Sequence, residues 1–336
     1  MTASHQPVRV VVVGYGRYGQ LHADAVRAEP GAQLVAVVDS DRTARERARE
    51  RLGATVPVVA SLDEVAEADA VVVATPDRHH LAPATAAVAR GCHVLVEKPV
   101  TTDVPAAAEL GRRAAAHGVH VAVGHLLRFD PRLRWLREQV ASGAWGPVVH
   151  MALLRNGAVE LRETYRDVSP VLQGGVHDID VAQWLAGSPI GTVTCEVARA
   201  PDGAAAFMTM TGRTALGCVV TVHAGRTLDL PMPLDPQTWM SLATPSVTVT
   251  IDGDHPVRVV GAPAPPTPLR AATPVEMLAR QLEAFVDLVR GAPGGVLADL
   301  GDGARAVAVA LAAERSAARG GVPIAADRPD EHPPDP

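Results

Sequence analysis

The chain has 336 residues, of which 47% are hydrophobic and 20% charged, a balance typical of a globular protein large enough for two domains. The net charge is −6 and the three cysteines, Cys92, Cys195 and Cys218, are widely spaced, which argues against nucleic-acid binding, a disulfide framework and a cysteine-rich metal site. No apolar run approaches the roughly 18 residues of a membrane helix, and the N-terminus has no charged leader-like region. We therefore expect a cytoplasmic protein with no membrane, nucleic-acid or metal partner.

The first 124 residues alternate short apolar strands with helices. The expected strands cover 8–13, 33–38, 70–74, 93–96 and 119–123. The expected helices cover 18–29, 41–52, 82–90 and 105–117. The strands are apolar without alternating polar residues, which is typical of a parallel sheet covered by helices on both faces. The sequence predicts an α/β fold here, a doubly wound Rossmann domain over 1–124.

The pattern changes after residue 124. Helices are expected at 132–142, 176–185, 274–290 and 303–319. Strands, several of which alternate apolar and small polar residues, are expected at 148–154, 191–199, 204–210, 215–223, 239–243 and 246–251. This pattern predicts an α+β domain over 125–325 with a large, mostly antiparallel open sheet, and the proline-rich end, 326–336, is expected to be disordered.

A glycine-rich turn, Gly14-Tyr15-Gly16-Arg17-Tyr18-Gly19, directly follows the first strand. In this context the first glycine permits a tight turn, the second lets a pyrophosphate approach, and the third lets helix and strand pack closely. Asp39 ends the second strand, where a carboxylate accepts hydrogen bonds from ribose hydroxyls and repels a 2′-phosphate. The motif predicts a dinucleotide cofactor, NAD in preference to NADP. Arg42, three residues after Asp39, is the reservation, because its guanidinium could bind the 2′-phosphate of NADP.

Lys98 is the only lysine among the 31 lysine and arginine residues of the chain. In a chain with so strong a bias toward arginine, a lysine remains either where a compact ammonium with a movable proton is required or by chance. Its position after an apolar strand, in Glu97-Lys98-Pro99, favours a functional role. We predict that Lys98 is catalytic.

Five motifs together resemble the Gfo/Idh/MocA oxidoreductases. They are the glycine-rich turn, Thr75-Pro76-Asp77-Arg78-His79-His80, Glu97-Lys98-Pro99, Val123-Gly124-His125 with Arg128-Phe129-Asp130-Pro131, and Gly174-Gly175-Val176-His177-Asp178-Ile179-Asp180. The resemblance covers nearly the whole chain. It implies NAD(P)-dependent redox chemistry on sugars, cyclitols and related secondary alcohols, and a second domain whose open sheet carries the substrate on one face and often an oligomer contact on the other.

The resemblance also implies site residues. Lys98 and His177 correspond to the catalytic pair, and Asp180, one helical turn from His177, either orients the imidazole or contacts a substrate hydroxyl. Gln173 stands where many members have an aspartate, so the proton path is altered and Tyr165, His125 or Asp180 would compensate. These four residues form the predicted substrate-binding set. Asp178 points elsewhere and is expected to be structural. The predicted cofactor-binding set is Gly14, Tyr15, Gly16, Arg17, Tyr18, Gly19, Asp39, Ser40, Arg42, Thr75, Pro76, His80, Glu97 and Lys98; His80 is expected either to support this site or to begin a helix.

The expected activity is oxidation of a secondary alcohol, or reduction of the ketone, with Lys98 stabilising the alkoxide and His177 as general base. The acid-rich segment 156–180 suits an amino sugar or aminoglycoside in natural-product biosynthesis, or is a solvated loop beside a polyol site. A pocket formed by Arg155, Arg162 or Arg166 would instead suit a nucleotide sugar. A catalytically silent NAD-binding regulator, and an enzyme using NAD for elimination or glycoside cleavage, are the other readings. We expect a homodimer or homotetramer.

Overall fold

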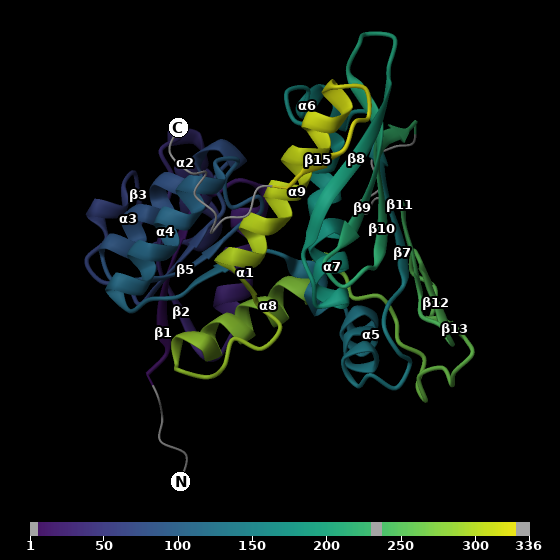
Figure 1. Ribbon diagram of the computed structural model, residues 1–336. Coiled ribbons are helices and arrows are strands. Elements are labelled where there is room, and N and C mark those ends of the chain that lie inside the picture. The colour runs from purple at the N-terminus through teal and green to yellow at the C-terminus, as the bar shows by residue number, and fades with distance from the viewer. Residues whose placement is uncertain (1–5, 230–236, 327–336) are drawn as a thin grey trace. The chain divides into compact units, whose positions relative to one another are not determined.

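The computed structural model describes residues 6–229 and 237–326, which form two compact units (Figure 1). Among the described residues, the first unit contains those up to Phe129 together with Ala272–Ala304, and the second contains those from Asp130 to Ala271 and from Arg305 onward. These units differ from the contiguous division into 1–124 and 125–325, because the segment from Ala272 returns to pack on the first unit. The predicted disordered end, 326–336, lies outside the described residues except for Ala326.

The described part of the first unit contains one seven-stranded sheet. Its strands, in spatial order, are β14 (Ala298–Asp299), β6 (Val121–Val123), β5 (His93–Val96), β4 (Ala70–Val73), β1 (Val8–Val13), β2 (Ala32–Val38) and β3 (Val58–Val59). All neighbours are parallel except β14, which runs antiparallel to β6. From β3 to β6 the order is 3-2-1-4-5-6, the order of dinucleotide-binding sheets.

Helices cover both faces of this sheet. Val10 and Val12 belong to a core with helices α1 (Arg17–Ala28), α2 (Arg42–Leu52) and α8 (Pro274–Val289), whereas Val11 and Val13 belong to a core with α3 (Leu81–Ala89) and α4 (Val104–His117). Successive strand residues point to opposite faces, so a strand buried on both sides must be apolar throughout. The predicted doubly wound sheet is confirmed.

The second unit is built on an eight-stranded sheet within the described residues. The strands, in spatial order, are β13 (Arg258–Val260), β12 (Thr248–Asp252), β11 (Gln237–Ala243), β7 (His150–Ala158), β10 (Val219–Leu228), β9 (Ala205–Thr214), β8 (Ile190–Arg199) and β15 (Ile324–Ala325). Only the β7–β10 pair, among these neighbours, is parallel. The predicted mostly antiparallel sheet is therefore confirmed.

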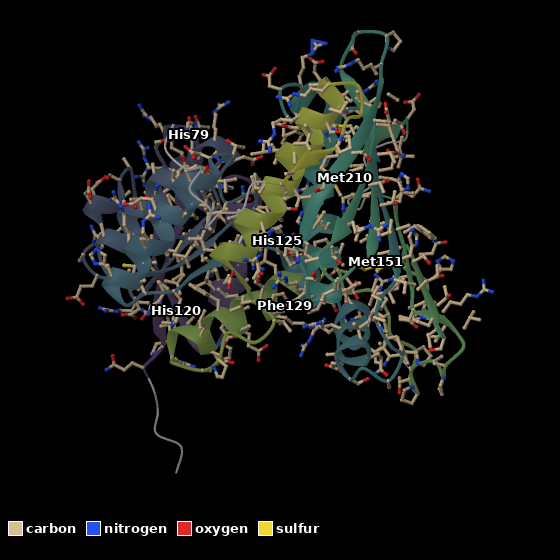
Figure 2. The ribbon with its side chains drawn as sticks, viewed as in Figure 1. His79, His120, His125, Phe129, Met151 and Met210 are labelled. Atoms are coloured by element: carbon tan, nitrogen blue, oxygen red, sulfur yellow. The ribbon has the colours of Figure 1, made fainter. Side chains whose placement is uncertain are left out.

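The two faces of this second sheet differ. Met151 and Met210, labelled in Figure 2, are fully buried on one face, and α7 (Val176–Ala186) packs on β7 and β10. Leu154, His223 and Trp239 occupy adjacent register positions on the other face and are only partly buried. The remaining helices with residues in this unit are α5 (Pro131–Ala141), α6 (Leu161–Thr164) and α9 (Leu300–Ala318). Over the described ranges, no helix is long and apolar enough to cross a membrane.

Candidate active site

The glycine-rich turn joins β1 to α1, and each glycine has its own reason to be there. Gly14 has φ +91°, and a Cβ on it would lie 2.7 Å from the backbone of Ala74 and Thr75. A Cβ on Gly19 would lie 1.8 Å from the carbonyl oxygen of Gly14. A Cβ on Gly16 would meet nothing within 4 Å, so the space beside it is open. This open space lies at the N-terminus of α1, which has no side-chain cap and no acidic residue in its first turn, and it fits a pyrophosphate.

The side chains of the turn divide into two groups. Tyr15 is fully buried in the core, so only its backbone can contact a cofactor. Arg17 and Tyr18 are exposed on the first turn of α1. The structure therefore leaves the side chains of Arg17 and Tyr18, but not that of Tyr15, accessible from solvent.

Asp39 lies beside the turn. Its Oδ2 accepts the amide of Tyr15 at 2.7 Å and its Oδ1 accepts the amide of Asp41 at 2.8 Å. A carboxylate has about four acceptor positions, so two such bonds orient it and leave acceptor capacity for ribose hydroxyls. The residues present thus fit NAD.

The arginine expected to compete for a phosphate is engaged elsewhere. Arg42 is largely exposed and pairs with Glu46 at 2.8 Å on the outer face of α2. Arg45, which the sequence analysis missed, donates to the carbonyl oxygens of Asp39 and Ser40, both at 2.8 Å. The i, i+4 relation of Arg42 and Glu46 was visible in the sequence, but a contact from Arg45 back to the strand end was not.

The Thr75-Pro76 segment follows β4 and touches the glycine turn, because the backbone of Thr75 lies against Gly14. The Thr75 hydroxyl donates to the His79 carbonyl at 3.0 Å. His80 is buried at the start of α3, with one ring nitrogen 2.7 Å from the Thr75 carbonyl and the other 2.7 Å from the Pro99 carbonyl. His80 therefore begins a helix and joins the loops after β4 and β5 through two backbone carbonyls, while its role at the cofactor site stays a prediction.

Glu97-Lys98-Pro99 follows β5. The Glu97 side chain is buried; its Oε1 lies 2.9 Å from Nε2 of His22, and its Oε2 accepts the amide of Lys98 at 3.2 Å. Burial by itself would raise the pKa of Glu97, but the hydrogen bond from His22 and the positive charges of His22, Lys98 and His80 outweigh burial, so the pKa lies below its ordinary value. Lys98 is only partly buried. Glu97 thus holds the Lys98 backbone by a hydrogen bond from inside the domain. Because its carboxylate is buried, it is not accessible to a cofactor.

His125, labelled in Figure 2, is buried immediately after β6. Gly124 lies against Glu97: a Cβ on Gly124 would be 3.1 Å from the Glu97 Oε2. Gly14, Asp39, Thr75, Lys98 and His125 therefore all lie at the carboxyl ends of parallel strands of one sheet, the edge at which ligands bind in doubly wound folds.

The second unit holds the other half of the predicted site. Residues Val171–Gly175 form a single π-helical turn that runs directly into α7. Gln173 lies in this turn, and His177 and Asp180 lie three residues apart on α7, where side chains share a face. Asp180 is buried and His177 partly buried. Single π turns within helices are frequent at functional sites, and neither the turn nor its length was predicted.

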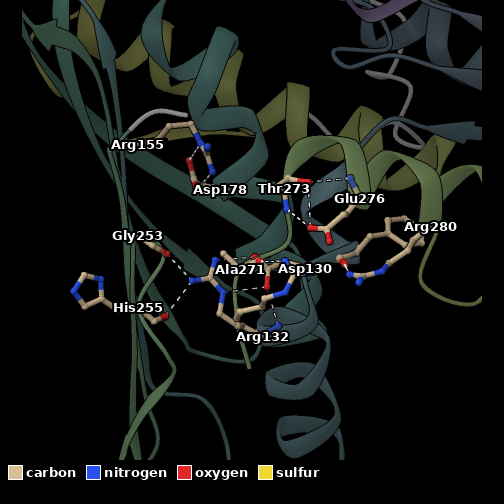
Figure 3. A network of polar contacts seen from close by, with 12 residues as sticks. Asp130, Arg132, Arg155, Asp178, Gly253, His255, Ala271, Thr273, Glu276 and Arg280 are labelled. Carbon is tan, nitrogen blue, oxygen red and sulfur yellow. Dashed lines mark hydrogen bonds and ion pairs between the residues drawn. The ribbon is translucent and has the colours of Figure 1, made fainter. Parts of the chain in front are cut away.

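Asp178 is structural, as expected. It holds Arg155 of β7 through two hydrogen bonds, at 2.9 and 3.1 Å (Figure 3). Arg166 pairs with Asp202 at 3.0 Å. Two of the three arginines considered for a phosphate pocket are thus already paired.

Tyr165 is held by Arg226, a residue that the sequence analysis missed. Arg226 of β10 is buried, donates to the carbonyl oxygens of Tyr165 and Val168 at 3.0 and 2.8 Å, and lies 5.8 Å from the centre of the Tyr165 ring. Burial lowers the pKa of Arg226 to about 10. A lone arginine in an alternating strand gives no sign in the sequence that it will fold inward to hold a loop.

The motif Arg128-Phe129-Asp130-Pro131 is explained by packing. Arg128 is buried and pairs with Asp302 at 3.0 Å within the first unit. In the second unit Asp130 caps α5 and pairs with Arg132 at 2.8 Å, and Arg132 reaches the carbonyl oxygens of Gly253 and His255 (Figure 3). The structure thus assigns these charged residues to ion pairs in the two units, Lys98 and His125 to the first unit, and Gln173, His177, Asp180 and Tyr165 to the second.

Comparisons with known proteins agree across both units. Residues 8–125 match the model of the Gfo/Idh/MocA oxidoreductase family with an NAD-binding Rossmann fold, and residues 133–243 match a C-terminal domain model of the same family. Two proteins of Saccharopolyspora erythraea, inositol 2-dehydrogenase 4 and inositol 2-dehydrogenase 1, are 35% and 33% identical to the chain; the alignments cover 66% of this chain and 67% of the first protein, and 96% of this chain and 98% of the second. The scyllo-inositol dehydrogenase of Lactobacillus casei, solved with NAD(H) and scyllo-inositol, has a TM-score of 0.81 at 20% identity, over 96% of this chain and 99% of that one.

Proposed function

The chain belongs to the Gfo/Idh/MocA family of NAD-dependent oxidoreductases acting on CH–OH groups, and from this premise we propose that it oxidises a secondary hydroxyl of a cyclitol or closely related sugar. The observation that carries the proposal is the position of Lys98, which follows β5 at the same sheet edge as the open space beside Gly16. The names of the two similar Saccharopolyspora proteins favour a cyclitol substrate.

The proposed mechanism uses this chain's own groups for everything except hydride acceptance, which NAD supplies when bound to the Gly14–Gly19 turn and Asp39. The Lys98 ammonium donates a hydrogen bond to the reacting hydroxyl and stabilises negative charge that develops on its oxygen. His177 takes the proton as general base, a contribution of about 10²–10⁴-fold. Gln173 cannot hold a proton, so Asp180, buried on the same helix, is the proposed partner that orients His177.

Two other substrate classes are weaker candidates. A nucleotide sugar would need free cations for its diphosphate, whereas Arg155 and Arg166 are already paired. An amino sugar or aminoglycoside would need accessible carboxylates in the segment 156–180. Asp178 is engaged by Arg155, but Glu163 and Asp167 are exposed, so this class stays in the test panel.

A catalytically silent NAD-binding regulator is the alternative from another class. Such a regulator would bind NAD without turnover and would not need a lysine at position 98. The presence of the chain's only lysine just after β5 therefore favours the enzyme.

The test is a panel of inositols, sugars, amino sugars and aminoglycosides, each with NAD and with NADP, in which the absorbance of the reduced nicotinamide is followed in both directions. The proposal expects NAD-dependent turnover with at least one cyclitol or sugar. If NAD binds by calorimetry but no compound is turned over in either direction, the silent regulator is favoured.

We also propose a cytoplasmic homo-oligomer. The oligomer is supported by the second face of the large sheet, where apolar and aromatic residues such as Leu154 and Trp239 are only partly buried. Light scattering should give a dimer or tetramer mass, and a monomer at micromolar concentration would rule the oligomer out.

A further inference from the structure

His80 has a hydrogen-bonding environment that a neutral histidine cannot satisfy. The side chain is 1% exposed at the start of α3. Its Nδ1 lies 2.7 Å from the carbonyl oxygen of Pro99, and its Nε2 lies 2.7 Å from the carbonyl oxygen of Thr75. Both partners are backbone carbonyls, which only accept hydrogen bonds.

A neutral imidazole carries one N–H, so one of these two short contacts would set a nitrogen lone pair against an oxygen lone pair. An imidazolium donates from both nitrogens and satisfies both carbonyls with charge-assisted bonds. We propose that His80 is protonated on both ring nitrogens and clamps the loop after β4 to the loop after β5, and that this clamp positions Lys98. The role in Lys98 positioning rests on the proposed dehydrogenase function, whereas the charge state of His80 does not.

A buried imidazolium needs a nearby negative charge. Glu97 provides it: the carboxylate is buried, and the charge of His80 is among those that lower the pKa of Glu97. The other charged or titratable groups acting on Glu97 are His22, from α1, and Lys98 itself. The Glu97 carboxylate is thus the buried negative charge that favours the extra proton on His80.

The clamp acts on both neighbours of Lys98. On one side the Glu97 carboxylate accepts the Lys98 amide at 3.2 Å, and on the other the Pro99 carbonyl is held by His80. Through Thr75 the same imidazolium reaches the segment that lies against Gly14 of the cofactor turn. His80 is therefore a positioning residue, and its loss should disturb turnover more than NAD affinity.

The charge state can be read directly by NMR of protein labelled with ¹⁵N at its histidine rings, with the His80 signals identified by their loss in His80→Gln. We expect both ring nitrogens of His80 to give protonated-type signals from pH 6 to 8.5. A signal typical of an unprotonated nitrogen at pH 7 would overturn the proposal. If His80→Gln does not fold, the wild-type titration can still overturn the proposal, because none of the 13 histidines keeping both protons at pH 8.5 would contradict it.

Kinetics test the positioning role. A glutamine amide donates from one nitrogen only, so His80→Gln should lose one carbonyl contact and lower kcat about 10- to 100-fold, as small displacements of catalytic groups do, with KM for NAD changed less than about threefold. His79→Gln is the matched control, because His79 is the exposed neighbour (Figure 2) and should keep wild-type kinetics. A folded His80→Gln with kcat within twofold of wild type would overturn the positioning role. If wild type itself turns over no compound, the proposed function fails, while the NMR result still decides the state of His80.

Discussion

The Nε2 atom of His22 lies 2.9 Å from the Oε1 atom of Glu97, and both side chains are buried beneath the strand end that carries Lys98. Because His22 lies in α1 and Glu97 directly follows β5, this contact ties the helix of the cofactor turn to the segment that carries Lys98. The pair makes the stability of the first unit depend on pH.

Glu97→Gln should lower the free energy of unfolding at pH 7 by about 1–3 kcal/mol, the usual cost of a disrupted buried hydrogen bond to a charged group. Because the folded state depresses the pKa of Glu97, its contribution is present above the unfolded value of 4.5 and is lost as the pH falls through the lower folded pKa. Urea unfolding between pH 7 and 3 should show wild type and variant converging below about pH 4.5. A constant difference down to pH 3 would contradict the assignment; Glu109→Gln, at an exposed pair, is the control and should change little.

The glycines of the cofactor turn can be separated by alanine substitution. Gly16→Ala should fold normally, because its φ is −72° and a Cβ there meets nothing within 4 Å, yet NAD affinity should fall at least about tenfold because the methyl group enters the space for the pyrophosphate. Gly19→Ala should destabilise the fold, because its Cβ would lie 1.8 Å from the Gly14 carbonyl oxygen. Thermal unfolding and calorimetric NAD titration measure the two effects, and undiminished NAD binding by Gly16→Ala would exclude this turn as the cofactor site.

Asp39 should set the choice between NAD and NADP. Asp39→Ala removes hydrogen bonds to a charged group that contribute about 1.5–3 kcal/mol. The variant should therefore bind NAD roughly 10- to 100-fold more weakly and should have a smaller preference for NAD over NADP. Asp41→Ala is the matched control: it removes the cap on α2, where Asp41 accepts the Ala44 amide at 2.7 Å, so it should cost about 1 kcal/mol of stability and leave cofactor preference unchanged. Kd values for both cofactors decide, and an unchanged NAD/NADP ratio in Asp39→Ala would refute the role.

The Arg155–Asp178 ion pair should stabilise the folded state of the second unit. Asp178→Leu would leave Arg155 mostly buried without its partner and should cost about 3–5 kcal/mol, whereas the double variant Arg155→Met/Asp178→Leu should recover much of that loss. Unfolding free energies of the two single variants and the double variant form a cycle that isolates the pair. Additive losses would mean that the two residues do not act together.

Much of the first unit could be predicted from sequence, because its signals are local. The apolar run 8–13, the glycines that follow it and Asp39 each act on residues close in the chain, and the structure places them as expected. By contrast, the two-residue strand β14 exists only by pairing with β6, and α8 joins the first unit by packing on α1 and on Leu126–Phe129. Such partnerships between distant segments leave no periodic pattern in the residues themselves.

The sequence named candidate residues for the site but did not indicate the contacts that hold them. Lys98 and His177 stood out by composition and motif, but His22, which contacts Glu97, and Arg226, which holds Tyr165, did not. A single histidine in a helix or arginine in a strand has no spacing that identifies its partner. Arg42 is the converse case. Its position near Asp39 in the sequence suggested a phosphate contact, whereas in the structure its side chain pairs with Glu46. Side-chain direction is decided by local packing that sequence position alone does not specify.

Replacement of the only lysine tests the central claim most directly. Lys98→Met removes the ammonium and keeps much of the side-chain volume, so kcat should fall about 10²–10³-fold, the cost of losing one donor to a developing oxyanion, while NAD affinity and thermal stability stay near wild type. Lys98→Arg keeps the charge on a bulky planar group and should also be strongly impaired. The measurement is kcat on the substrate identified in the panel, with the fold checked by thermal unfolding. Near wild-type turnover by a folded Lys98→Met enzyme would show that Lys98 is not the catalytic residue.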